Sequence, residues 1–321
     1  MARTRPWKYR SGRRSSLEMA TRVFRPETAA AAIDAAANAA LCLGMGCPDP
    51  VLLHASQHVS VRLFPSGPVA RVVRNDSHSV RKLCRELDVA HHLAARGAPA
   101  VRLCGTIPPG PYSLDGHAMT FWEFVTHIPA DSDNSVHVEQ ALATLLRVHE
   151  ALGDFPGELP DFWAKIDECR DLLRSQAMLP LLDCEDRQFL EEIYERLSVS
   201  LARLPLNRVP IHGDAHPGNV LITPHGALWN DFEGVCLGPR EWDMGWWLVG
   251  EAGRSSVRRA GIDAAAGLDS ANGNALVMLG YLRSFCVCVW CWNLADIPEK
   301  RKAAEFHLGY LKEQASEGKI R

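Results

Sequence analysis

Three side chains in the second half of the chain have the types and spacing needed for phosphoryl transfer. Asp214 lies in His-Gly-Asp, Asn219 follows five residues later, and Asp231 lies in Asn-Asp-Phe-Glu at the end of an apolar run. Moving a terminal phosphoryl group needs a carboxylate that orients the acceptor hydroxyl and accepts its proton, and oxygen ligands that hold Mg²⁺ against the phosphates. The sequence therefore predicts Asp214 as the catalytic base and Asn219 and Asp231 as magnesium ligands.

The local sequence also predicts how these residues meet. The catalytic loop of protein kinases has the same Asp-to-Asn interval, and an Asp-Phe-Gly signature supplies the next magnesium ligand. Here Glu233 replaces that glycine. Residues 220–222 and 227–229 have the pattern of short strands joined by a turn. Such a hairpin would return Asp231 to a place beside Asn219.

The segment from Ile211 to Trp247 closely resembles the aminoglycoside phosphotransferase family. Members carry His-Gly-Asp with an Asn five residues on, then Asp-Phe/Trp-Glu, then a Gly-Pro-Arg segment that ends in Asp-Leu-Ala; residues 238–245 here read Gly-Pro-Arg-Glu-Trp-Asp-Met-Gly. The resemblance implies an α+β, protein-kinase-like two-lobed fold with a small antiparallel-sheet N-lobe and a larger, mainly helical C-lobe. It also implies that His212 and Asp243 support the catalytic loop.

The first half of the chain has the strands expected of a nucleotide-binding lobe. Alternating apolar residues predict one strand over 59–63 and a second over 69–74. The resemblance implies that Arg71 binds the α and β phosphates of the donor, with Arg74 as the alternative. Strand alternation places these two arginines on opposite faces, so only one can face the cleft.

Apolar residues at helical spacing predict a helix from Ser79 to Arg96, which carries Glu86 at the edge of its apolar stripe. A carboxylate beside an apolar face needs a partner. The resemblance implies that this partner is Arg71. The alternative is a solvated glutamate with no role, which is the usual state of glutamate.

Two further segments are assigned to the nucleotide by their order along the chain. The segment His-Ala-Ser-Gln-His around Ser56 stands where a protein kinase has a glycine-rich loop, yet it contains no glycine. By the resemblance, Ser56 offers its hydroxyl or N–H to a phosphate; an ordinary connection between strands is an equal alternative. Residues 121–125 resemble the hinge that contacts the purine, which assigns nucleotide binding to Trp122, Glu123 and Phe124. A plain buried strand is the alternative there.

Composition and charge favour a folded, cytoplasmic protein. Residues 1–20 would form a basic, disordered tail, or follow from a misread start before Met19, or act as a nucleic-acid arm; lobes would follow over 21–125 and 126–316. No apolar stretch follows the tail, so a secretory signal is not expected. Beyond residue 20 the chain has 29 basic and 37 acidic residues, a net charge of −8. An acidic body favours cationic ligands over nucleic acid.

The cysteines and the remaining apolar segments favour a reduced, buried core. Ten cysteines are scattered without a paired metal-binding pattern, so buried thiols are expected. Arg283 interrupts the apolar run from Leu276 to Ala295, which favours a buried helix over a membrane span. His149 is expected to be a buried structural histidine. Further helices are predicted over residues 26–43, 136–152, 162–178, 186–203, 244–251 and 298–313.

These observations predict an ATP- or GTP-dependent, Mg²⁺-dependent O-phosphotransferase. Its acceptor would be a cationic or hydroxylated small molecule, an aminoglycoside or another antibiotic, which would give a role in antibiotic resistance. Alternatives are a kinase of choline, homoserine or a sugar amine, and a non-catalytic nucleotide-binding regulatory protein on the same scaffold. A third is a hydrolase whose metal is bound by His212, Asp214 and His216. The sequence leaves the oligomeric state open, and the acids available to hold amino groups are Asp154, Asp161, Asp167, Glu168 and Asp243.

Overall fold

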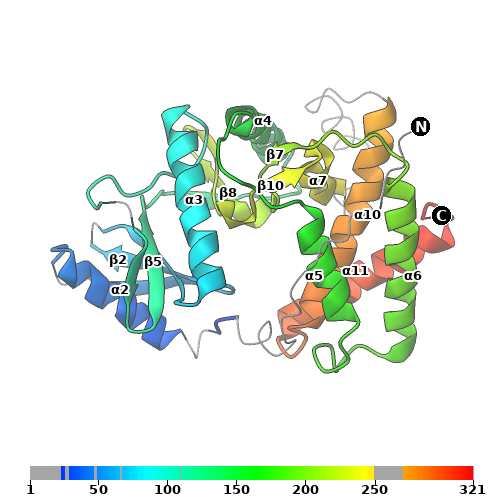
Figure 1. The fold of residues 1–321 in the computed structure, drawn as a ribbon, viewed down its shortest axis with the longest axis horizontal. Coiled ribbons are helices and arrows are strands. Elements are labelled where there is room, and N and C mark those ends of the chain that lie inside the picture. Colours follow the sequence, from blue (N-terminus) through cyan, green and yellow to red (C-terminus); the bar gives the residue numbers. More distant parts are fainter. Residues whose placement is uncertain are drawn as a thin grey trace.

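A computed structural model describes residues 23–25, 29–46, 49–65, 67–108, 110–248 and 270–320. Two parts lie side by side in Figure 1: an antiparallel sheet with two helices, and a larger part built mainly of helices. We call these parts the N-lobe and the C-lobe. The predicted α+β, kinase-like architecture is confirmed.

The N-lobe is built around a five-stranded antiparallel sheet in the order β1-β2-β3-β5-β4. Val59, Val61 and Leu63 alternate with polar residues, and all three are almost completely buried. Helix α2 (Ala30–Cys42) covers this apolar face with alanines, whose small side chains allow close packing. The strands are β1 (Asp49–Ala55), β2 (Val59–Phe64), β3 (Val69–Arg74), β4 (Tyr112–Leu114) and β5 (His117–Trp122).

Helix α3 (Ser77–Ala95) connects the sheet to the C-lobe. The Asp76 side chain caps its first turn by accepting hydrogen bonds from the N–H groups of His78 and Ser79. Such caps satisfy backbone donors that a helix leaves without partners. The helix stands on the side of the sheet that faces the C-lobe (Figure 1). Its bounds lie within two residues of the predicted ones.

The catalytic segment of the C-lobe consists of short strands. Strands β8 (Val220–Thr223) and β9 (Gly226–Trp229) form the predicted hairpin, with Val220 opposite Trp229. The short β6 (Ile128–Pro129) pairs with β8, and β7 (Val209–Ile211) pairs with β10 (Cys236–Gly238). The 3₁₀ turns η2 (Pro217–Asn219) and η3 (Phe232–Gly234) carry the residues that flank the hairpin.

Longer helices form the rest of the C-lobe. They are α4 (Ser135–Leu152), α5 (Trp163–Leu173), α6 (Cys184–Leu201), α10 (Ser270–Trp292) and α11 (Pro298–Ser316). Helix α10 contacts α5, α6 and α11 and forms the centre of this lobe. It is the one described helix long and apolar enough to cross a membrane, and 78% of its apolar window, Gly273–Trp292, is buried. The burial agrees with the expected core helix.

Two predicted helices have different bounds. Helix α5 ends at Leu173, five residues before the predicted end, because Arg187 of α6 binds the carbonyl groups of Leu173 and Leu179 and holds the chain in turns there. The helix predicted from residue 244 begins earlier, as α7 (Arg240–Met244), and becomes the 3₁₀ turn η4 (Gly245–Leu248). Residues 249–251 of that prediction and residues 26–28 of the first helix lie outside the described residues.

The described cysteines form no disulfide. Nine are free thiols, and five of these are buried. Their location agrees with the expectation of reduced thiols inside the core, although Cys42 and Cys184 are exposed.

Candidate active site

The hairpin brings the three predicted catalytic residues together. The N–H of Asn230 donates to the carbonyl of Asn219 at 3.0 Å, so Asp231 follows directly beside Asn219. The Asn219 side-chain amide donates to the carbonyl of Asp214, also at 3.0 Å. One loop therefore holds Asp214 and Asn219, and the hairpin returns Asp231 to them, as the sequence predicts.

Asp231 has an unusual backbone. Its φ of 66° lies in the left-handed region, which residues other than glycine rarely adopt. The next N–H, that of Phe232, donates to Glu86 Oε1 at 3.0 Å, which helps to hold the turn. Strain of this kind persists only where surrounding contacts fix it, and it often marks a functional site.

Arg71 links the N-lobe to Asp231. Its Nη1 donates to Glu86 Oε1 at 2.6 Å and to Asp231 Oδ1 at 2.8 Å, and the residue is only 3% exposed. Burial alone would raise the pKa of Asp231, but the Arg71 charge outweighs it and lowers that pKa. Arg74 points to the other face and lies 4.7 Å from the ring of Phe24. The pairing of Arg71 with Glu86 and the opposite orientation of Arg74 both agree with the sequence analysis.

Glu86 is fully enclosed in this cluster. Burial raises its pKa to about 8, and the positive charge of Arg71 opposes that rise. Its Oε2 atom has no hydrogen-bond partner among the described residues, while Oε1 serves both Arg71 and Phe232. The alternative of a solvated Glu86 is therefore wrong.

Asp243 lies beneath the catalytic loop. Its carboxylate accepts hydrogen bonds from the N–H groups of His212 and Gly213, each at 2.8 Å, and from His149 Nε2 at 2.7 Å. His149 and Asp243 are each 1% exposed. These contacts place Asp243 where it can fix the loop backbone, and they make His149 the buried structural histidine that was expected.

The His212 ring is engaged on both edges. Its Nδ1 accepts from the Asp214 N–H at 3.3 Å, and its Nε2 donates to the carbonyl of Asn230 at 3.0 Å. Burial lowers its pKa, so the ring is neutral. A ring with both nitrogens occupied cannot bind a metal. The geometry therefore opposes the alternative of a hydrolytic metal site on His212, Asp214 and His216.

Two cations that the sequence analysis missed contact the predicted base. Lys165 Nζ lies 3.0 Å from Asp214 Oδ1, and the Arg283 guanidinium binds the same oxygen. Burial alone would raise the pKa of Asp214, but the charges of Lys165 and Arg283 hold it well below its usual value. The arginine inside an apolar run was the available signal for Arg283. No comparable signal marks Lys165 on an ordinary amphipathic helix.

The segments assigned to the nucleotide have mixed geometry. The Ser56 N–H donates to the carbonyl of His58 at 2.9 Å, which leaves the hydroxyl as the group that Ser56 could offer a phosphate. Trp122 ends β5 and is buried, while the exposed Glu123 donates its N–H to the carbonyl of Arg102. Phe124 follows outside the strand, with the Arg62 guanidinium 3.5 Å from its ring centre. The plain-strand alternative fits only the first two residues of the run 121–125.

His58 is another residue that the sequence analysis missed. Burial lowers its pKa to about 3, so the ring is neutral, and its Nδ1 has no hydrogen-bond partner among the described residues. One ligand atom from each of His58, Asp231 and Glu233 lies within 4.8 Å of the others. This group could hold a metal ion, but Mg²⁺ prefers oxygen ligands, which favours Asn219 and Asp231 for that ion.

The acids proposed for amino-group binding are engaged elsewhere. Asp154 pairs with Arg96, Asp161 with Arg208, and Asp167 with Arg170. Asp243 lies under the loop, and Glu168 is exposed. None of the five has a described contact with Asp214. The expectation that they surround the acceptor gains no support.

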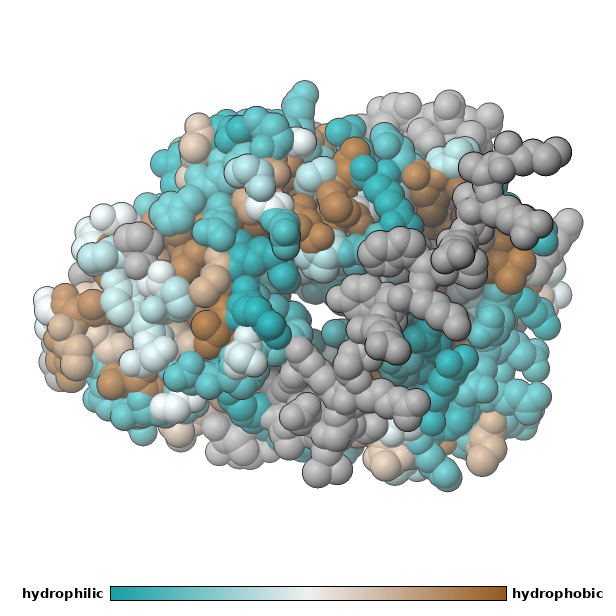
Figure 2. Space-filling view, in the orientation of Figure 1, coloured by the Kyte–Doolittle hydropathy of each residue, from teal (hydrophilic) through white to brown (hydrophobic). Residues whose placement is uncertain are grey.

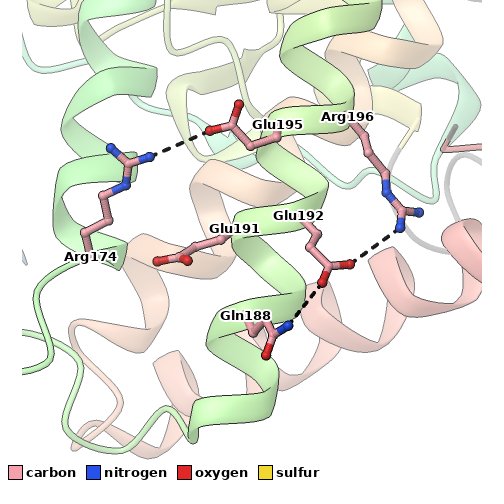
Figure 3. A pocket seen from close by; sticks show the side chains of 6 residues that line it. All are labelled: Arg174, Gln188, Glu191, Glu192, Glu195 and Arg196. Carbon is pink, nitrogen blue, oxygen red and sulfur yellow. Dashed lines mark hydrogen bonds and ion pairs between the residues drawn. The ribbon is translucent and has the colours of Figure 1, made fainter.

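A surface hollow elsewhere in the C-lobe is lined by charged residues of α6 and the end of α5 (Figure 3). Its ion pairs, Arg174 with Glu195 and Arg196 with Glu192, are 3.7 and 3.5 Å long and solvent-exposed. Exposed pairs of this kind are typical of an ordinary surface. The hollow between the lobes, which is bordered by hydrophilic residues in Figure 2, is instead adjacent to the catalytic loop.

Comparisons with known proteins agree with this geometry. The chain matches the phosphotransferase enzyme family, abbreviated APH, over residues 53–275. No curated protein sequence matches significantly. Among solved structures, the GDP and kanamycin complex of APH(2")-IIia has a TM-score of 0.62 at 16% identity, covering 84% of this chain and 93% of its own.

Two further solved structures show the same fold. A microcompartment-associated aminopropanol kinase has a TM-score of 0.66 at 18% identity and covers 85% of this chain and 94% of its own. An ethanolamine kinase from Plasmodium vivax has a TM-score of 0.60 at 13% identity and covers 85% and 84% respectively. Because the family match spans most of the chain and includes the catalytic loop, this protein belongs to the phosphotransferase enzyme family.

Proposed function

We propose that this protein is a small-molecule kinase that transfers the terminal phosphoryl group of ATP or GTP to an acceptor hydroxyl. The observation that carries the proposal is the assembly of Asp214, Asn219 and Asp231 around one loop, with Arg71 reaching Asp231 from the other lobe. A nucleotide-binding regulatory protein would not need this complete set. Phosphoryl transfer relies mainly on positioning and charge, which is what these contacts supply.

On the acceptor side, the carboxylate of Asp214 would orient the hydroxyl and take its proton. Its low pKa keeps it ionised at neutral pH, so it can accept a hydrogen bond from the acceptor. A weak base suits a loose transition state, in which the attacking oxygen has gained little bonding before the donor bond breaks. Asp214 would then act chiefly by positioning the hydroxyl.

On the donor side, Arg71 would bind the α and β phosphates while Glu86 holds its side chain in place. Arginine is suited to this because its guanidinium stays charged and binds phosphate through paired N–H groups. The Ser56 hydroxyl would add a phosphate contact. The purine would lie against the segment of Trp122, Glu123 and Phe124.

The donor atoms near the hairpin fit Mg²⁺. The Asn219 amide nitrogen donates to Asp214, which directs hydrogen-bonding capacity away from the amide oxygen, and only Oδ1 of Asp231 is used by Arg71. One amide oxygen and one carboxylate oxygen are ligands of the kind that Mg²⁺ prefers. Bound there, Mg²⁺ would neutralise the phosphates of the donor.

The acceptor would be a small hydroxylated molecule. The solved structures with this fold include, by their descriptions, a kanamycin complex, an aminopropanol kinase and an ethanolamine kinase. Both antibiotics and small amino alcohols therefore occur on the scaffold. Fold similarity alone does not select between these classes.

The test uses Asp214→Asn, which preserves the shape of the side chain and removes its charge. We expect acceptor-dependent ADP or GDP release to fall by about 10²–10⁴-fold, the usual contribution of a positioned acid or base. Nucleotide affinity, measured by calorimetry, should stay within about threefold of the parent value because the donor contacts remain.

Asp88→Asn is the matched control, since Asp88 is an exposed residue of α3. The assay would cover aminoglycosides, macrolides, choline, homoserine and sugar amines with each nucleotide. Turnover in Asp214→Asn equal to that of the Asp88→Asn control would contradict the proposed role.

A further inference from the structure

The predicted base is surrounded by more positive charge than it can balance. Lys165 of α5 and Arg283 of α10 both bind Asp214 Oδ1, so two cations share one carboxylate. The adjacent His216 adds no negative charge, because burial lowers its pKa to about 4 and leaves its ring neutral. The acceptor side of the loop therefore carries an excess positive charge.

The two cations differ in mobility. The Lys165 side chain is 44% exposed, whereas that of Arg283 is 4% exposed. Arg283 also donates to the carbonyl of Gly213 at 3.2 Å and lies 5.2 Å from the ring of Trp242. Arg283 is thus a fixed charge, while Lys165 has a flexible stem and an ammonium that can move within reach of solvent.

The surroundings are poorly suited to a cationic acceptor. Four of the five acids proposed for amino groups already have partners at other places, as shown above. Aromatic rings could replace acids by binding a cation on their faces. The ring of Trp246, however, already has the Arg283 guanidinium 5.7 Å from its centre. Among the described residues, the acceptor side offers an incoming ammonium group repulsion and little attraction.

We propose that Lys165 and Arg283 form an anion-binding pair, and that the acceptor carries a carboxylate or phosphate group close to the hydroxyl that is phosphorylated. This inference rests on the kinase function proposed above. Lys165 turns from Asp214 to the anion of the acceptor, and Arg283 remains on Asp214 and Gly213. The exchange releases one lone pair of Asp214 for the acceptor hydroxyl at the moment when the acceptor binds.

The proposal predicts the acceptor class. Hydroxy acids and phosphorylated alcohols would bind, and their charge would be recognised by charge-assisted hydrogen bonds from Lys165. Neutral polyols would bind weakly. Aminoglycosides and amino alcohols without an acid group would be disfavoured.

The first experiment measures inorganic phosphate binding by calorimetry, with the donor site filled by the non-hydrolysable analogue AMP-PNP and Mg²⁺. The parent protein should bind phosphate saturably, and Lys165→Met should weaken that binding by tenfold or more. Lys302→Met, an exposed lysine of α11, is the control and should bind as the parent does. AMP-PNP affinity should be the same in all three proteins.

Matched compounds then identify the charge that is recognised. Glycerate, glycerol and 3-aminopropane-1,2-diol share a three-carbon skeleton, and glucuronate, glucose and glucosamine share a ring. Only glycerate and glucuronate should displace phosphate from the parent protein. A phosphorylated alcohol, glycerol 3-phosphate, should do so as well, and its strength relative to glycerate distinguishes the two kinds of anion.

Three outcomes would overturn the inference. The first is no saturable phosphate site in protein that binds AMP-PNP; the acceptor inference then fails while the kinase proposal stands. The second is equal phosphate binding in Lys165→Met and the parent. The third is a tenfold loss of AMP-PNP affinity in Lys165→Met, which would assign the lysine to the phosphoryl group of the donor. Failure of AMP-PNP to bind the parent at all would instead contradict the proposed kinase function.

Discussion

At the scale of single residues, Asp231 is the point where donor and metal requirements meet. Its backbone is left-handed, and its carboxylate is shared between Arg71 on one oxygen and the predicted metal position on the other. The low pKa of Asp231 keeps both oxygens unprotonated above the acid range. A neutral amide at this position would keep the shape and lose the charge that both partners need.

Asp231→Asn should therefore weaken nucleotide binding chiefly when Mg²⁺ is present. We expect the affinity for MgATP to fall by about tenfold or more, because a charged oxygen ligand is replaced by a neutral one. Calorimetric titration of ATP with Mg²⁺ and with EDTA checks this. Removal of the metal should lower the affinity of the parent towards that of the variant; a variant that binds MgATP as tightly as the parent would disprove the metal role.

His307 provides a pH dependence with a defined sign. It is 5% exposed, and burial lowers its pKa to about 4 from an ordinary value of 6.5. Below pH 6.5 the unfolded chain therefore binds a proton at this residue that the folded chain does not, and acid stabilises the unfolded state. Stability from neutral His307 is complete above pH 6.5 and is lost as the pH falls towards 4.

The prediction compares the parent with His307→Gln, which keeps a polar group near Ser284. Between pH 7 and pH 5, the parent should lose about 2 kcal/mol of unfolding free energy that the variant does not lose. Urea unfolding at both pH values measures this difference. Contributions from Glu86 and the other buried histidines are common to both proteins and cancel. Parallel pH profiles would show that His307 does not titrate as expected.

At the scale of elements, the turn at Gly213 allows the catalytic loop to lie against β10. Its φ is 78°, and a Cβ there would lie 2.0 Å from the carbonyl oxygen of Gly234. The position therefore needs glycine for two reasons, backbone conformation and close approach. Gly44 has the same φ of 78° but nothing within 4 Å of an added Cβ.

These two glycines separate strain from collision. Gly44→Ala should lower the unfolding free energy by about 1–2 kcal/mol, the cost of a left-handed backbone at alanine. Gly213→Ala should cost clearly more, because the added methyl group also forces Gly234 and the catalytic loop apart. Urea unfolding of the two variants gives the comparison. Equal losses would mean that the loop accommodates the methyl group without moving.

At the scale of the whole molecule, α3 joins the two lobes through the turn η3. Glu86 accepts from the N–H of Phe232, and Arg85 Nη2 donates to the carbonyl of Glu233 at 3.0 Å. With the Arg71–Asp231 pair, these contacts connect the N-lobe to the metal-binding turn. The position of the N-lobe is therefore coupled to the conformation of Asp231.

Arg85→Met should weaken this connection while leaving the apolar stem in place. The lost hydrogen bond from a charged group is worth about 1.5–3 kcal/mol, which should lower the melting temperature by at least about 3 °C. Arg81→Met is the matched control, since Arg81 lies one turn earlier on α3 and is exposed. Calorimetric melting measures both. A melting temperature equal to that of the control would show that Arg85 does not hold the lobes together.

The local sequence was sufficient where neighbouring residues determine the geometry. The hairpin from Val220 to Trp229 has a short turn and paired apolar strands, so its residues alone bring Asp231 to Asn219. Strand alternation alone separated Arg71 from Arg74. The helix carrying Glu86 was equally predictable, because its apolar residues repeat at helical spacing and its first turn is capped by Asp76.

The tertiary structure decided what lies around Asp214. Arg283 is 69 residues away from Asp214 in the chain, and the crossing of α10 behind the loop brings the two into contact. Lys165 reaches the same oxygen from α5. No local pattern records such contacts, because they depend on how separate helices pack. The sequence by itself determined the catalytic loop and its fold, whereas helix packing determined the positive charge of the acceptor side.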